Sequence, residues 1–266
     1  IVFNILSKFF KIYAQDFFKT LVFCTYSFGH GLMRDYHGNL GYFIVVVPLN
    51  TITVLMFTSG EGNPLGNWTN YLKGVIPLWK FITRIIVQIA AGLSAYRLGR
   101  TIYKLDYHWS FAHQLTETEC TSALTVPVYA GFLIELSGTM YDAWVGYQQL
   151  LRFKPLEIFL KFMNMAAVVC MGVYLTGMFM HPSMATGLTF GCKGTSPLEH
   201  IFVYWAGPFI GIFLALKLDK FINLRGAKKT EKESSRTDTS KENHLEEQDQ
   251  WNNNLRQRKK KKYYTK

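Results

Sequence analysis

Apolar residues are gathered into six stretches, each close to the length of about 20 residues that an α-helix needs to cross a bilayer. The stretches lie near residues 13–33, 39–57, 77–98, 127–149, 158–176 and 198–218. The first five stretches are interrupted by polar residues or proline, among them Lys19, Pro48, Arg84, Glu135 and Asn164. Polar groups inside a membrane usually face a bundle interior or a water-filled path. The pattern therefore predicts an all-α membrane protein whose six helices pack on one another.

Two further segments, residues 58–73 and 177–192, are too short to cross a membrane. Each has glycine on its approach and then proline where the first turn of a helix would begin, a position at which the missing N–H does no harm. The two motifs read Asn63-Pro64-Leu65 and His181-Pro182-Ser183. Each segment is therefore predicted to be a half-helix that dips back into the bilayer.

Matching residues recur at the spacing of half the apolar body. Two lone acids, two residues that precede proline, and two glycines are 119, 118 and 119 residues apart, respectively: Asp16 and Glu135, Asn63 and His181, Gly92 and Gly211. Three spans per half make the second copy enter the membrane inverted, so the two half-helices would meet near the midplane. We expect repeats over 13–98 and 127–218. An unrepeated six-span bundle is the alternative.

Charge separates the chain into three parts. The net charge of +11 divides between an apolar body, 13–222, and a polar tail, 223–266, that ends in a run of Arg and Lys; residues 1–12 precede the first span. The tail is expected to be disordered and able to attract anionic lipid headgroups. A generic solvated tail is equally consistent, and nucleic-acid binding is not expected of a segment tethered to a bilayer.

Basic residues at the ends of the spans predict that both termini are cytosolic. With that orientation, ten would lie inside and five outside: inside Lys8, Lys11, Lys73, Lys80, Arg84, Arg152, Lys154, Lys161, Lys217 and Lys220, and outside Arg34, Arg97, Arg100, Lys104 and Lys193.

The cysteine, histidine and acidic residues do not predict a metal site. The four cysteines form no CxxC pair, and Cys120 and Cys192 fall on the non-cytosolic side, where they could pair. One loop gathers possible ligands, which would suit a membrane-bound hydrolase or oxygenase: Asp106, His108, His113, Glu117 and Glu119. No second histidine cluster completes such a centre. We therefore expect no cofactor and no metal.

The sixth span carries the most specific motif, because residues 200–211 closely resemble the sixth helix of aquaporins. Gln88 with Gly92, Glu135, and the Asn63-Pro64-Leu65 box also resemble that family, and the likeness covers residues 13–222. In place of the family's second Asn-Pro-Ala box stands His181-Pro182-Ser183, and Met184 occupies the position of the Arg that normally follows. Such altered boxes resemble the superaquaporin branch, which contains aquaporins eleven and twelve.

The resemblance implies a right-handed bundle of six transmembrane helices and two re-entrant half-helices, a homotetramer, and an intracellular membrane such as the endoplasmic reticulum rather than the plasma membrane. Asn63 would donate hydrogen bonds to a passing solute, although it also suits an ordinary N-cap. His181 is expected to be a neutral donor, because helix N-termini and desolvation disfavour the imidazolium. A pH gate, or a His181 that only caps its helix, are the alternatives.

Counting from the two boxes places four apolar residues at the selectivity filter: Phe43, Val169, Met178 and Met184. Water crossing such a filter sheds hydrogen bonds that the wall does not replace, so we expect slow water flux and a preference for neutral solutes such as glycerol or hydrogen peroxide. Helix packing is the alternative role for Val169 and Met178. Asp16, Glu135 and Gln88 are expected to hold the dipping segments through hydrogen bonds to their backbone.

The sequence as a whole predicts a passive membrane channel for water or small neutral solutes, and not an enzyme. The competing interpretation keeps the fold but closes the pore with Phe43, Met178 and Met184, which would leave a structural or interaction protein.

Overall fold

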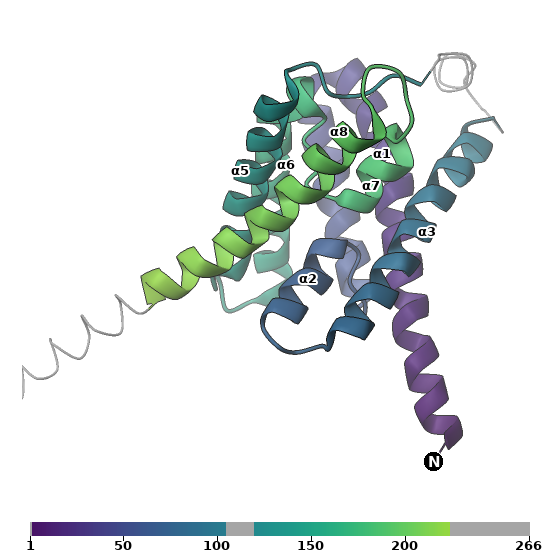
Figure 1. Ribbon diagram of the computed structural model, residues 1–266, viewed down its shortest axis with the longest axis vertical. Coiled ribbons are helices and arrows are strands. Elements are labelled where there is room, and N and C mark those ends of the chain that lie inside the picture. Colours follow the sequence, from purple (N-terminus) through teal and green to yellow (C-terminus); the bar gives the residue numbers. More distant parts are fainter. Residues whose placement is uncertain (1, 105–119, 224–266) are drawn as a thin grey trace, which may run out of the picture. The chain divides into compact units, whose positions relative to one another are not determined.

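The computed structural model describes residues 2–104 and 120–223, and Figure 1 shows their arrangement. The chain divides after Leu216 into two units, and of the second unit only a helical piece, residues 217–223, is described. The tail beyond it and the loop with the five possible metal ligands lie outside the described residues. The first unit, Ile1–Leu216, contains both half-helices and the helices that pack around them.

The first two predicted spans form one continuous element, α1 (Val2–Met56), which is two helices joined at Gly38. Gly38 has φ 65° and ψ −165°, a conformation that glycine adopts without the clash of a Cβ atom. The chain reverses there, so the predicted boundary between residues 33 and 39 is confirmed.

The other elements follow the predicted order. They are α2 (Pro64–Leu72), α3 (Leu78–Lys104), α5 (Val128–Tyr147), α6 (Lys154–Thr176), α7 (Pro182–Thr189) and α8 (Pro197–Ile201), which runs into the π-helical turn η1 (Phe202–Ala206). Both predicted half-helices are present as α2 and α7, and each begins at the predicted proline. In Figure 1 these short helices lie between α3 on one side and α5 and α6 on the other.

Four helices of the described residues are long and apolar enough to cross a membrane: Gly29–Met56, Leu78–Ile102, Lys154–Thr176 and Pro197–Asn223. The remaining two predicted spans are helical but carry more polar side chains. Asp16, Lys19 and His30 lie in the first, and Glu135 and Asp142 lie in α5. Because Asp16, Lys19, His30 and Glu135 are buried within the bundle and Asp142 is partly buried, the average composition of the two helices understates how apolar their outer faces are.

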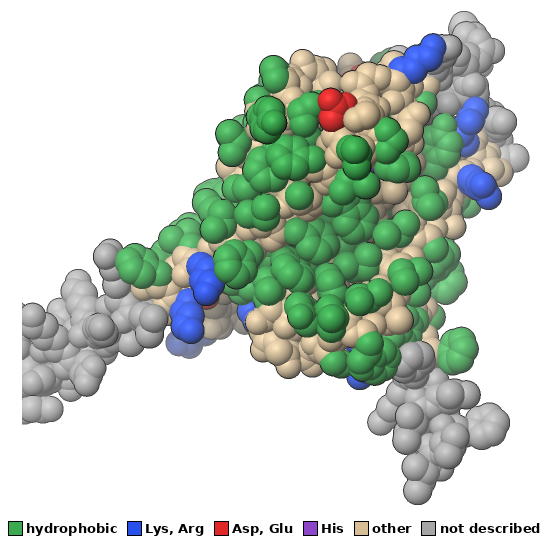
Figure 2. Space-filling view, viewed as in Figure 1, with side chains coloured by type: hydrophobic (Ala, Val, Ile, Leu, Met, Phe, Trp, Pro, Cys, Tyr) green, Lys and Arg blue, Asp and Glu red, His purple; other side chains and the backbone are tan. Residues whose placement is uncertain are grey.

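The visible face of the protein is covered by apolar side chains (Figure 2). Tyr129, Met171 and Leu198 each expose about 70 to 80% of their surface. A soluble protein rarely leaves so much apolar surface in contact with water, whereas a hydrocarbon environment accepts it.

Glycine permits the closest helix contacts. A Cβ atom on Gly92 of α3 would lie 2.3 Å from the Ser183 carbonyl oxygen of α7, and one on Gly187 would lie 2.3 Å from the Gly92 carbonyl oxygen. Gly207 and Gly211 approach the backbone of α5 in the same way, at 3.1 Å from the Phe132 oxygen and 2.6 Å from the Leu136 oxygen. Gly92, Gly207 and Gly211 therefore allow close helix crossings.

Replacing Gly92 with alanine is expected to push α7 away from α3 and to destabilise the protein by about 1–3 kcal/mol, the usual cost of overpacking. Thermal unfolding of the purified protein in detergent measures the effect. Gly146→Ala in α5 is the matched control, because nothing lies within 4 Å of its Cβ position. Equal unfolding temperatures for the two variants would contradict the role assigned to Gly92.

Candidate functional site

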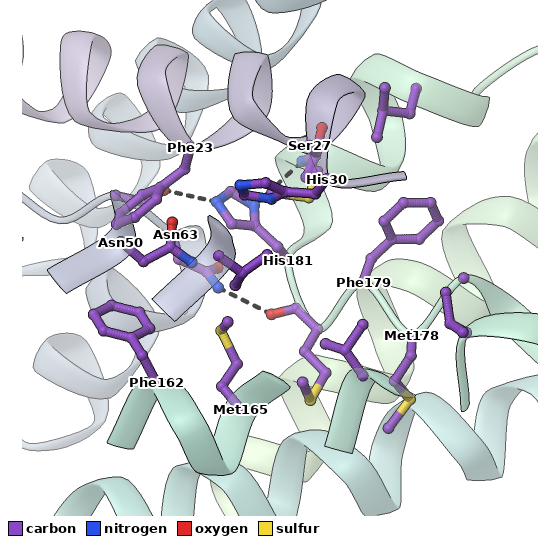
Figure 3. Close-up of a pocket in the computed structure, with 18 of the residues that line it drawn as sticks. Phe23, Ser27, His30, Asn50, Asn63, Phe162, Met165, Met178, Phe179 and His181 are labelled. Atoms are coloured by element: carbon purple, nitrogen blue, oxygen red, sulfur yellow. Dashed lines mark hydrogen bonds between the residues drawn. The ribbon is translucent and has the colours of Figure 1, made fainter. Parts of the chain in front are cut away.

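The two half-helices are joined by a reciprocal pair of hydrogen bonds. Asn63 donates from Nδ2 to the Met180 carbonyl oxygen over 2.9 Å, and His181 lies 2.7 Å from the Gly62 carbonyl oxygen through Nε2. Each side chain therefore binds the backbone immediately before the other motif. Figure 3 shows the two motif residues facing each other. The expectation that Asn63 and His181 converge is met.

Each of the two residues also caps its own helix. Asn63 Oδ1 accepts from the Leu65 N–H at 3.0 Å, and His181 Nδ1 accepts from the Met184 N–H at 3.2 Å. Since Nδ1 accepts, the imidazole is neutral and carries its proton on Nε2. That single N–H is directed at Gly62, whereas the Asn63 amide has two N–H groups and directs one of them at Met180. The cap that was considered as an alternative for each residue is thus present.

In the first half, a buried ion pair holds the approach to α2. Asp16 accepts from the Glu61 N–H at 2.7 Å, and its carboxylate binds the Arg84 guanidinium through two hydrogen bonds. Gln88 donates to the Glu61 carbonyl oxygen at 2.8 Å, and Lys19 donates to Gly60 at 2.7 Å. Both backbone groups of Glu61 are therefore fixed by buried side chains.

Arg84 has a different role from the one that the charge count gave it. Its side chain is only 9% exposed and its charge is compensated by Asp16. Arg84 is therefore not a free basic residue at a cytosolic end, and it contributes nothing to the bias that was used to orient the termini.

In the second half, one carboxylate holds the approach to α7. Glu135 accepts from the Thr176 hydroxyl at 2.8 Å and from the N–H groups of Phe179 and Met180 at 3.0 Å each. Met178 and Met180 have φ values of 42° and 46°, a left-handed conformation that side chains other than glycine rarely adopt. Glu135 thus binds two consecutive backbone N–H groups in this left-handed segment.

A cavity of about 530 Å³ opens beside the joined half-helices. Asn63 and His181 line it, together with Val169, Met178 and Met184 from the predicted filter. Figure 3 shows the labelled lining residues around the two motifs.

Phe43, the fourth predicted filter residue, is not among the side chains that line this cavity. It packs instead against the cluster of Tyr42, Val46 and Ala166. Tyr42 and Val46 line the cavity from the same helix. Because neighbouring helical residues point about 100° apart, counting from a distant motif with an error of one residue selects the wrong face.

Two buried polar groups on the cavity were missed at the sequence level. His30 Nε2 and Asn50 Oδ1 have no hydrogen-bond partner, although their residues are only 8% and 6% exposed. Helical spacing along the sequence could have identified both residues. Lining residues of α1 recur every three or four positions, at Lys19, Phe23, Ser27, His30 and Arg34, and again at Tyr42, Val46, Asn50 and Val54.

Cys120 and Cys192 form a disulfide, with their Cα atoms 4.9 Å apart. Next to it, the Ser122 N–H donates to Lys193 and the Lys193 N–H donates to Cys120. The segment after α7 is thereby tied to the segment before α5. The proposed pairing is confirmed.

Among the described residues, no group of three or more His, Cys, Asp or Glu side chains is placed to hold a metal ion. The five candidate ligands of the loop after α3 fall outside those residues, so their arrangement stays undescribed.

No protein-family model matches the chain. It is 21% identical over 216 residues to aquaporin-11 of Milnesium tardigradum, a match that covers 79% of this chain and 76% of the relative. A second match, 28% identical over 142 residues, is to putative aquaporin-12A of Homo sapiens and covers 50% of this chain and 47% of the relative. Among solved structures, the aquaglyceroporin from Plasmodium falciparum superposes with a TM-score of 0.62 at 13% identity, covering 80% of this chain and 96% of that one.

The chain is aquaporin-like in sequence and in fold. Its relatives include aquaporins eleven and twelve, so the resemblance is to the superaquaporin branch. The aquaporin-like fold is an all-α membrane fold, and the cavity of about 530 Å³ lies where its two half-helices meet. His181 and Met184, which depart from the family's pattern, both line that cavity.

We predict that Arg84→Met destabilises the protein by about 3–5 kcal/mol, because it leaves the buried Asp16 carboxylate without its counter-ion. Adding Asp16→Asn should recover much of this loss, since asparagine keeps an oxygen for the Glu61 N–H and carries no charge. Chemical denaturation in detergent micelles gives the free energies of unfolding. A double variant as unstable as Arg84→Met alone would show that the pair does not act as an ion pair.

Proposed function

We propose that the chain is a passive membrane channel for small neutral solutes, and not an enzyme. The observation that carries the proposal is the cavity of about 530 Å³ at the junction of two half-helix N-termini, with Asn63 and His181 on its wall. Helix N-termini carry partial positive charge, which disfavours cations and leaves neutral solutes as the natural occupants. The names of the relatives, aquaporins and an aquaglyceroporin, point to the same class of solute.

The lining suits a solute that is only partly polar. Val169, Met178 and Met184, with Tyr42 in place of Phe43, supply few hydrogen bonds. The only N–H of the His181 ring donates to the Gly62 carbonyl oxygen, so of the two motif residues Asn63 has the second N–H that can face a solute. We therefore propose slow water flux and better conduction of glycerol or hydrogen peroxide.

Further features of the proposal concern the assembly. The corresponding contacts of Asp16 with Glu61 and of Glu135 with Phe179 support an inverted repeat over 13–98 and 127–218. We propose a homotetramer in an intracellular membrane such as the endoplasmic reticulum, with cytosolic termini and a basic tail close to anionic lipid. The resemblance to the superaquaporin branch supports the membrane assignment.

Blocking the cavity tests the channel directly. Met165→Trp is expected to lower solute flux at least tenfold, because Met165 lines the cavity and tryptophan would fill it. Met163→Trp is the matched control on the same helix, since Met163 is 39% exposed and is not a lining residue. Stopped-flow light scattering of proteoliposomes with water, glycerol and hydrogen peroxide measures the flux.

Two results separate the proposal from the closed-pore interpretation. Flux in the parent that Met165→Trp abolishes and Met163→Trp leaves intact supports a channel. A parent no more permeable than empty vesicles to every neutral solute supports a structural or interaction protein.

His181→Asn is expected to raise water flux several-fold, because an amide can bind Gly62 and still present a second N–H to the cavity. The water flux of each protein should be the same at pH 5.5 and pH 7.5. Protonation of His181 at Nδ1 is unfavourable, because the new N–H would face the Met184 N–H that now donates to Nδ1. The measurement is osmotic water permeability at both values. Flux of the parent that changes with pH, and is flat in His181→Asn, would instead establish a pH gate.

A further inference from the structure

Arg34 is a charged residue on the cavity wall to which the proposed channel assigns no task. It lies on the same face of α1 as Phe23, Ser27 and His30, all of which line the cavity. Four residues later the chain turns back at Gly38, so Arg34 stands about one helical turn before the end of its span. Its side chain is 15% exposed.

The guanidinium is held by a cation–π contact and by an ion pair whose acid is partly exposed to solvent. Its carbon lies 5.0 Å from the centre of the Tyr174 ring, a cation–π contact. Asp35 is 3.5 Å from one terminal nitrogen, but its own side chain is 55% exposed and so largely solvated. Nε of Arg34 is buried and has no hydrogen-bond partner. An arginine side chain stays protonated in proteins, so this position keeps its positive charge.

Arg34 shares the cavity wall with the filter residues. Tyr42, the lining residue found in place of Phe43, and Val169 both line the cavity that Arg34 lines. Arg34 and Met184 line the same cavity.

Arg34 decides the sign of the net formal charge on the cavity wall, because the wall has three other charged residues. They are Lys19, Glu61 and Asp142, bound respectively to the Gly60 carbonyl oxygen, Asn70 and Asn164. With Arg34 the formal charges of the wall sum to zero, and without it two acids face a single lysine.

From this arrangement we propose that Arg34 is a specificity-determining residue that excludes cations from the cavity. The proposal rests on the proposed channel function and adds the electrostatic barrier to it. A positive charge on the wall of the cavity raises the energy of a passing cation and leaves a neutral solute nearly unaffected. The first span thus adds a full positive charge to the partial charges of the half-helix N-termini, because Met184 supplies none.

The test compares ion and neutral-solute permeability in one set of proteoliposomes. Arg34→Met is expected to increase the leak of K⁺ and of protons, relative to the glycerol flux of the same vesicles, by roughly tenfold or more over the parent. Arg34→Lys should keep the leak at the parent's level, because the charge is retained. Arg97→Met is the matched control, since Arg97 lies on α3 and outside this cavity.

A second variant keeps the test decisive. Adding Met184→Arg to Arg34→Met should restore exclusion, because both positions open on the same cavity. If Arg34→Met does not fold, Arg34→Gln replaces it and is subject to the same comparison. Size-exclusion chromatography and the neutral-solute flux itself report folding.

Each outcome has one meaning. The proposal is supported if the parent conducts neutral solutes, Arg34→Met raises the ion leak, and Arg34→Lys keeps the ion leak of the parent. Neutral flux with an ion leak unchanged by losing the charge overturns the role of Arg34 and leaves the channel standing. No neutral flux in the parent removes the channel function, and this inference with it.

Discussion

The site depends on the exchange of hydrogen bonds between the two half-helices. Asn63 binds the carbonyl oxygen before His181, and His181 binds the carbonyl oxygen before Asn63. A helix that starts inside a membrane exposes N–H groups that no water can satisfy, so a reentrant segment is stable only where protein supplies partners. Here each half-helix is capped by its own first side chain and tied to the other by the same side chain.

The two halves hold the segments that precede α2 and α7 with different electrostatic interactions. The first half fixes its approach segment through Asp16, which is paired with Arg84, and the second through Glu135, whose described partners are a hydroxyl and two backbone N–H groups. An ion pair compensates a buried carboxylate by charge, whereas Glu135 is compensated by donors alone. The second approach is also the one with left-handed residues at Met178 and Met180, so its donors come from a backbone turned to face the acid.

Replacing an amide by an imidazole changes what the junction offers to a solute. An amide can hold the backbone and still donate, but an imidazole has one N–H for both tasks. With Met184 and Val169 nearby, the wall becomes less polar than a pair of asparagines and an arginine would make it. Much of the remaining polarity comes from spanning helices rather than from the half-helices, through His30, Asn50 and Arg34 on α1 and Asp142 on α5.

Spacing along the sequence was enough to find the helices and the motifs. Apolar runs of bilayer length fix the spans, and a proline after Asn63 or His181 fixes where α2 and α7 begin, because both signals are local. Asp16 and Glu135 also stand out in the sequence, since an acid in an apolar run needs buried donors. Only the tertiary structure decided which side chains share the cavity. Phe43 and Tyr42 are neighbours in sequence and face different ways, and Arg84 pairs with a residue 68 positions away. The commitment of the His181 N–H to Gly62 also depends on the approach of two segments from different halves of the chain. These contacts depend on how each helix is rotated and packed. Hydrophobic periodicity predicts which face of a helix is buried, but not which residue of that face meets a given partner.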